Sequence, residues 1–261
     1  MKLSRKIKDK KNHVLSNVVL AVSVVVFILA AYQLFRIGKG YQDGRKDYKE
    51  IQDLAITKKK DKKSGEDKFI VDFEKLAEKN PDVIGWLRFD PEPKVINYPI
   101  VQGKDNQEYL HKTFSKNENG LGAIFLNVDN SSKFKDKHSI IYGHRMKDGS
   151  MFRHLQDYEK KEFWKKNQRF FIYTPSGRVI TYRVYSAGEV LDMSDAYETE
   201  FANGTEYQEF IDQTKKDSIY DTGVKVRTSD KVVTLSTCTQ ASDNHRFVVH
   251  GVKESEDVVE E

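Results

Sequence analysis

The sequence predicts a mainly β domain with peripheral helices, preceded by an N-terminal transmembrane helix. Seven short segments are rich in Val, Ile, Thr, Phe and Tyr and are separated by turn-forming residues, as strands are. Helical periodicity is confined to a few short stretches, and one early stretch, Val14–Phe35, carries no charged side chain. Many short strands at this spacing are typical of a β-barrel or a β-sandwich.

The segment Val14–Phe35 predicts an uncleaved membrane anchor. It has 22 residues, 18 of them apolar, and at about 1.5 Å per residue it crosses a hydrocarbon core of roughly 30 Å. A cleaved signal peptide is the alternative, but its apolar core usually has about 7 to 15 residues, and Leu29-Ala-Ala31 is a weak cleavage signal. Six basic residues and one acid precede the segment. We therefore expect residues 1–13 in the cytoplasm and the chain after Phe35 outside the cell, in a single-pass arrangement.

The charge balance argues against nucleic-acid binding. Residues 1–66 contain 16 basic and 7 acidic side chains, so this part has a net charge of +9 and the whole-chain value of +4 leaves −5 for residues 67–261. The folded part therefore has no basic excess to match phosphate. Residues 36–68 read as a partly helical stalk, and the run Lys58–Lys63 within it reads as a solvated linker near anionic head groups.

The folded domain is expected at residues 69–252. Asp72 is placed to cap a short helix that runs through Lys79 and stops at Asn80-Pro81, and Pro175-Ser-Gly177 predicts a tight turn. Strands are expected at 95–101, 123–127, 139–142, 169–174, 179–190, 231–238 and 246–252, and helices at 106–111, 151–158 and 206–216. Residues 253–261 form an acidic tail that we expect to be disordered.

The last two strands predict a hairpin that pairs the chain's single cysteine with an arginine. In a regular hairpin Cys238 lies opposite Arg246, with directly paired side chains roughly 5 Å apart. A fixed positive charge beside a thiol favours the reactive thiolate and supplies a donor for an oxyanion. The alternative is that Cys238 is a small, inert buried residue.

A cysteine nucleophile needs a histidine as proton acceptor and donor. His144 ranks first, because it follows Ile140-Ile-Tyr-Gly143 at the exit of an apolar strand, where side chains project from a sheet rim. His245, in the hairpin turn, ranks second. His250 is expected opposite Thr234 and about 13 Å along the strand from Arg246, too far away to serve Cys238.

Several motifs resemble those of sortases, and of class B sortases in particular. Thr234-Leu-Ser-Thr-Cys238 followed by Arg246-Phe-Val-Val-His-Gly251 is similar to the active-site hairpin of that family. Colinear motifs between residues 70 and 252 extend the resemblance: Asn80-Pro-Asp-Val-Ile-Gly-Trp86, Tyr98-Pro-Ile-Val-Gln102, Asp105-Asn-Gln-Glu-Tyr-Leu110, Gly122-Ala-Ile-Phe-Leu126 and Ile141-Tyr-Gly-His-Arg-Met-Lys-Asp-Gly-Ser-Met-Phe152.

The resemblance implies a closed β-barrel of about eight strands and a cysteine transpeptidase of Gram-positive bacteria. Cys238 would attack a threonine carbonyl in the sorting signal of a secreted protein and form a thioacyl-enzyme. His144 would move the protons, and Arg246 would steady the oxyanion or the backbone of the signal. Ser236, Asn106 and Leu110 match substrate-groove positions, with ordinary packing as the alternative for these three.

The same resemblance implies the partners. These are secreted proteins with an Asn-Pro-x-Thr-like signal, an amine of a peptidoglycan precursor or cross-bridge, and the membrane. We expect no metal and no cofactor, because the chain has no clustered acidic ligand set like that of calcium-using class A relatives. Two other functions stay open at this point: an extracellular cysteine hydrolase or protease that uses water as acceptor, and a non-catalytic surface-binding module.

Overall fold

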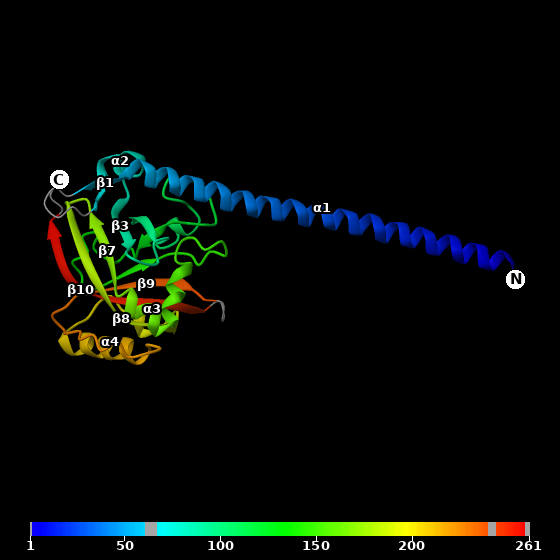
Figure 1. The fold of residues 1–261 in the computed structure, drawn as a ribbon. Helices are drawn as coiled ribbons and strands as arrows, with labels where there is room; N and C mark the ends of the chain where they lie inside the picture. Colours follow the sequence, from blue (N-terminus) through cyan, green and yellow to red (C-terminus); the bar gives the residue numbers. More distant parts are fainter. Residues whose placement is uncertain (1, 61–66, 240–243, 259–261) are drawn as a thin grey trace. The chain divides into compact units, whose positions relative to one another are not determined.

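The computed structural model describes residues 2–60, 67–239 and 244–258 (Figure 1). Parts of three predicted segments lie outside this description: residues 61–66 of the linker, 240–243 of the hairpin turn and 259–261 of the tail. The side chains of residues 2–15, 58–60 and 67 are also outside it. The chain forms two compact units, residues 1–43 and 44–261.

The described helices and strands alternate as short elements after one long helix. The helices are α1 (Lys2–Ala55), α2 (Phe73–Lys79), α3 (Lys161–Lys166) and α4 (Gly204–Lys216), with 3₁₀ turns η1 (Glu108–Leu110), η2 (Arg153–Glu159) and η3 (Asp195–Tyr197). The strands are β1 (Ile56–Lys60), β2 (Asp67–Val71), β3 (Val83–Phe89), β4 (Asn97–Val101), β5 (Ile124–Leu126), β6 (His138–Tyr142), β7 (Arg169–Thr174), β8 (Arg178–Leu191), β9 (Val232–Cys238) and β10 (His245–Val258).

Eight strands close into a barrel in the order β10-β8-β7-β3-β4-β5-β6-β9, with β9 paired to β10. This confirms the barrel and excludes the sandwich. Most neighbours are antiparallel, but β4 pairs with β5 and β6 pairs with β9 in parallel. The parallel β6–β9 pair matters for function, because it brings the exit of β6, where His144 follows, to the same end of the barrel as the end of β9, where Cys238 stands.

Helix α1 contains an apolar stretch whose described side chains are exposed. Its most apolar 18-residue window has a mean hydropathy of 2.6 and none of it is buried; Phe27, for example, is 73% exposed. Such a continuous apolar surface is stable in lipid rather than in water, so the helix is consistent with a membrane anchor.

Several local predictions are confirmed. Asp72 accepts a hydrogen bond from the backbone N–H of Lys75 and caps α2, which ends at Lys79. Helix α4 buries Tyr207, Phe210 and Ile211 on one face.

Other elements differ from the prediction. Strand β3 was not expected, because Gly85 interrupts its apolar run at a register shift. The helices expected at 106–111 and 151–158 are 3₁₀ turns in the structure, η1 and η2. The sequence analysis also missed helix α3 and the antiparallel pair of strands β1 and β2.

The expected boundaries of the domain also shift. The segment 36–68 was assigned to a stalk, but Tyr48, Ile51 and Ala55 are buried in the second compact unit, which begins at Gly44. At the other end, residues 253–258 continue β10 and pair with β8 as far as Val258. The acidic side chains of this segment find basic partners on the barrel, Glu254 with Arg169 and Glu256 with Arg178, which explains why it is ordered despite its composition.

Candidate active site

The predicted pairing of the cysteine with the arginine is present. Cys238 lies directly opposite Arg246 across the β9–β10 ladder, and Ser236 opposite Val248. Cys238 is an exposed free thiol at the last residue of β9. The barrel wall therefore presents a thiol and a guanidinium side by side at its rim.

The guanidinium of Arg246 is held by contacts on both sides. Its Nη2 lies 3.3 Å from Oδ2 of Asp192, which follows β8, and its Nη1 donates a hydrogen bond of 3.0 Å to the carbonyl oxygen of His245. Because β8 and β10 pair along their length, Asp192 is placed beside Arg246 by the barrel itself. These contacts orient the positive charge beside the thiol.

Cys238 and Arg246 line a pocket of about 260 Å³ together with all four other residues predicted for the site. Its wall comprises Asn106, Gln107, Leu110, Phe125, Tyr142, Gly143, His144, Asp192, Tyr197, Ser236, Thr237, Cys238 and Arg246. A thiol, a guanidinium and an imidazole around one cavity are the groups that acyl transfer through a thioacyl intermediate requires.

His144 is oriented by a backbone carbonyl. Its Nε2 lies 2.7 Å from the carbonyl oxygen of Leu110, and since a carbonyl only accepts, Nε2 carries the hydrogen and Nδ1 of the neutral ring keeps its lone pair. Burial lowers the pKa of His144, the bond to Leu110 opposes this shift, and the neighbouring His111 adds to it. The His111 ring stacks at 6.2 Å from that of His144. His144 is therefore a neutral base near pH 7.

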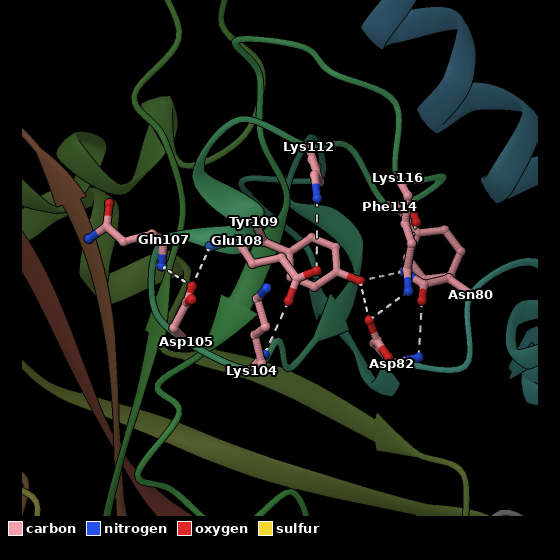
Figure 2. A network of polar contacts seen from close by, with 10 residues as sticks. All are labelled: Asn80, Asp82, Lys104, Asp105, Gln107, Glu108, Tyr109, Lys112, Phe114 and Lys116. Carbon is pink, nitrogen blue, oxygen red and sulfur yellow. Dashed lines mark hydrogen bonds and ion pairs between the residues drawn. The ribbon is translucent and has the colours of Figure 1, made fainter.

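The turn that supplies the Leu110 carbonyl is anchored by a polar network (Figure 2). The buried Tyr109 donates a hydrogen bond of 2.6 Å to Oδ2 of Asp82 and accepts one of 2.9 Å from the side chain of Asn80. Burial and the neighbouring Asp82 raise the pKa of Tyr109, so its hydroxyl stays protonated. The Asp105 carboxylate accepts hydrogen bonds from the backbone N–H groups of Gln107 and Glu108 and so stabilises the start of η1.

Two tyrosines and Asn106 also line the pocket. The rings of Tyr142 and Tyr197 stack in parallel at 6.4 Å. Tyr197 shares a hydrogen bond of 2.7 Å with Ser236 Oγ, and burial raises its pKa, so it remains neutral. Asn106 accepts a bond from the backbone N–H of Val128 and so has a structural partner besides the pocket it lines.

The other histidine assignments can be compared with the structure. His245, ranked second, begins β10 and is not among the described residues that line the pocket. His250 lies opposite Thr234, as predicted, and its Nδ1 is 2.7 Å from Thr234 Oγ1 in the buried wall rather than at the rim. Leu110 contributes more than was predicted, because its carbonyl holds His144.

Sequence reasoning missed Asp192, Tyr197 and Gln107 in the pocket wall. The first two lie in the long connection after β8, where sequence gives no register once the strand has ended. One signal was available for Asp192: it follows a strand that pairs with the one carrying Arg246. Using it would have required the strand order of the barrel, which sequence alone did not supply.

Comparison with known proteins agrees with this geometry. The family model described as the sortase domain matches residues 91–254. Sortase B of Staphylococcus aureus is 30% identical over 86% of this chain and 89% of its own length, and sortase B of Listeria monocytogenes is 38% identical over 67% and 71%. A solved structure, the Staphylococcus aureus sortase B-substrate complex, superposes with a TM-score of 0.65 at 34% identity and covers 70% of this chain and 84% of its own. The chain belongs to the sortase family, as a class B sortase, and is a sortase-type enzyme.

Proposed function

We propose that this transpeptidase cleaves a sorting signal after threonine and joins the new carboxyl end to a peptidoglycan amine. The observation that carries the proposal is the convergence of Cys238, Arg246 and His144 on one pocket. The similarity of this chain to a sortase B whose structure was solved in complex with a substrate supports a sorting-signal peptide as the ligand. An Asn-Pro-x-Thr-like signal is the form we expect.

In the first half-reaction neutral His144 takes the proton of the Cys238 thiol, and the resulting thiolate attacks the threonine carbonyl carbon. A carbon–sulfur bond forms, and the carbonyl oxygen becomes an oxyanion that the Arg246 guanidinium stabilises. When the tetrahedral adduct collapses, the carbon–nitrogen bond breaks and protonated His144 gives its proton to the departing amine. The product is a thioester between the threonine and Cys238.

In the second half-reaction an amine attacks that thioester. Neutral His144 accepts the proton of the attacking nitrogen, the new carbon–nitrogen bond forms, and Cys238 leaves as a thiolate that regains a proton from His144. One peptide bond replaces another, so the exchange needs no external energy source. Ser236, Asn106 and Leu110 lie on the pocket wall, and we assign them to contacts with the signal.

The apolar helix α1 supports a placement at the cell membrane. We propose that residues 1–13 stay in the cytoplasm and that the barrel lies outside, where secreted proteins and peptidoglycan amines are both present. The negative net charge of residues 67–261 suits a surface that handles peptides rather than nucleic acid.

The test uses the full chain in detergent with an Asn-Pro-x-Thr peptide, with and without a short peptide amine. We expect mass spectrometry to detect a thioester on Cys238 and a product that incorporates the amine. Cys238→Ala, His144→Ala and Arg246→Ala should each abolish cleavage, whereas His154→Ala, which lies outside this pocket, should retain it. Cleavage by Cys238→Ala would overturn the mechanism, and a product that never contains the amine would identify a hydrolase instead.

A further inference from the structure

The last turns of helix α1 belong to the catalytic unit. Tyr48, Ile51 and Ala55 are spaced to lie on one helix face, and each is less than 5% exposed. Gln52 on the neighbouring turn donates a hydrogen bond of 2.8 Å to the carbonyl oxygen of Asn97. The juxtamembrane end of the helix is thus packed on the barrel rather than extended as a free stalk.

Tyr48 reaches His144 by way of Gly122. Its hydroxyl donates a hydrogen bond of 2.6 Å to the Gly122 carbonyl oxygen, and the group is buried. Gly122 has a φ of +60°, and a Cβ at this position would lie 2.9 Å from Cδ2 of His144 and 2.7 Å from the Leu110 carbonyl oxygen. The Gly122 backbone therefore packs against one side of the His144 ring, and Tyr48 holds that backbone from behind.

The same tyrosine reaches His144 by a second path. Its ring packs edge-on against Tyr98, with centroids 5.2 Å apart. The Tyr98 hydroxyl accepts a hydrogen bond of 3.1 Å from the backbone N–H of Met151. The next residue, Phe152, donates its backbone N–H to the carbonyl oxygen of His144 at 2.9 Å. One side chain of α1 thus supports both the ring and the backbone of His144.

We propose that Tyr48 is a positioning residue for His144, through which the juxtamembrane helix sets the geometry of the catalytic base. The inference rests on the proposed role of His144 in proton transfer. Proton transfer requires hydrogen-bond distance between the base and the reacting atom, so a small displacement of the ring costs rate. Tyr48 is not among the described residues that line the pocket, so we expect KM to be independent of it.

The informative variant is Tyr48→Phe in the full chain in detergent. It keeps the ring against Tyr98 and removes only the bond to Gly122. We expect kcat to fall by about tenfold, in line with the cost of small misplacements of a catalytic group, with KM unchanged. Gln52→Ala is the matched control, because it deletes another hydrogen bond from the same helix to a backbone carbonyl, and it should leave kcat unchanged.

A second readout does not depend on catalysis. The ring nitrogens of His144, followed by NMR in selectively labelled protein, should show a pKa closer to the ordinary histidine value in Tyr48→Phe, since a loosened ring is better hydrated. Gln52→Ala should match the wild type. Circular dichroism of each variant establishes that the barrel is folded in the assay.

The outcomes separate the inference from the proposed function. Wild-type kcat together with a wild-type His144 titration in Tyr48→Phe would overturn the positioning role, as would an equal loss in Gln52→Ala. If no sorting peptide is cleaved by the wild type, the proposed function is wrong, but a changed titration in Tyr48→Phe alone still supports the link between Tyr48 and His144.

Discussion

Acidification from pH 7 to pH 5 should destabilise the barrel by about 4 kcal/mol, because two histidines are buried in its wall as neutral rings. His138 Nδ1 donates to the Glu198 carbonyl at 2.6 Å, so its Nε2 accepts from the Thr234 hydroxyl at 2.6 Å. Thr234 Oγ1 in turn accepts from His250 Nδ1 at 2.7 Å. This chain of donors requires a neutral His138, because a protonated Nε2 could not accept from Thr234, whereas protonation of His250 would add a buried hydrogen at its Nε2. Nε2 of His250 is buried and has no hydrogen-bond partner among the described residues.

The magnitude follows from the difference between the folded and unfolded states. Burial lowers the pKa of His138 to about 4 and that of His250 to about 3, with the neighbouring His138 adding to the second shift. In the unfolded chain both titrate near pH 6.5, so their contribution to stability is complete above that pH and is lost as the pH falls toward the folded values. At pH 5 the unfolded state has gained nearly one proton at each site, which costs roughly 2 kcal/mol per histidine.

The assay is urea unfolding of residues 44–261, the second compact unit, at pH values between 8 and 5. Tryptophan fluorescence follows it, because both tryptophans, Trp86 and Trp164, are buried in this unit. His250→Asn keeps a donor near the position of Nδ1 and cannot titrate, so it should remove about half of the pH dependence. His154→Asn removes a half-exposed histidine paired with Asp157 and should leave the dependence intact.

Two results would refute this reasoning. Stability that stays constant between pH 7 and pH 5 would mean that the buried rings are already charged or solvated in the folded state. An unchanged slope in His250→Asn, with a reduced slope in His154→Asn, would place the titrating group on the surface. Carboxylates with a lowered pKa, such as Glu256 at about 2, lose their contribution to stability mainly below pH 5, so they do not account for a change between pH 7 and pH 5.

Three further predictions concern the pocket. Gly122→Ala should lower kcat at least about tenfold, because Gly122 has a positive φ and the added Cβ collides with His144 and with neighbouring backbone. Peptide cleavage kinetics measure this change, and a wild-type kcat would contradict the packing. Asp192→Asn should lower kcat only about two- to fivefold, because its contact with Arg246 is partly exposed, while Asp195→Asn has no effect; a complete loss would show that the carboxylate has another role. The rate constant for aminolysis of the thioester, expressed per free-base amine, should be constant above pH 6.5 and fall as the pH drops through the lowered pKa of His144. Single-turnover kinetics with preformed thioester measure it, and a fall beginning above pH 6.5 would show that burial does not control this group.

Much of the barrel could be predicted because its strands are rich in β-branched and aromatic residues and are bounded by turn residues. The expected strand at 179–190 is found as β8 (Arg178–Leu191), and the turn before it, with Gly177 at a φ of +70°, is where Pro175-Ser-Gly177 placed it. Strand β3 escaped because Gly85 interrupts its apolar run at a register shift. The end of α1 escaped for a different reason. Its polar composition suits a solvated stalk, and only the tertiary packing shows that Tyr48 and Ile51 are buried.

The active-site pairing could be predicted because cross-strand register follows from a short hairpin. Once β9 and β10 are recognised, the period of two places Cys238 opposite Arg246 and turns His250 toward Thr234. No comparable local rule connects β6 with β9, which are parallel neighbours separated by some ninety residues. The ranking of His144 over His245 therefore rested on strand-exit geometry rather than on register, and the family resemblance agreed with it.

What holds His144 in place is the part of the site that sequence could not show, and the reason is physical. The ring is held by the backbone carbonyl of Leu110 and by the backbone of Gly122. Backbone contacts of this kind leave no signal in the amino-acid sequence. Their support comes in turn from Tyr109, through Asp82, and from Tyr48 on the helix that continues from the apolar segment. A nucleophile and its oxyanion donor need only one hairpin, whereas a base that must stay neutral and oriented needs burial and backbone contacts from several segments. The proposed base, His144, should therefore be more sensitive than the proposed nucleophile, Cys238, to changes far from the pocket, and a variant at Tyr48 should change the titration of His144 and leave the reactivity of the Cys238 thiol unchanged.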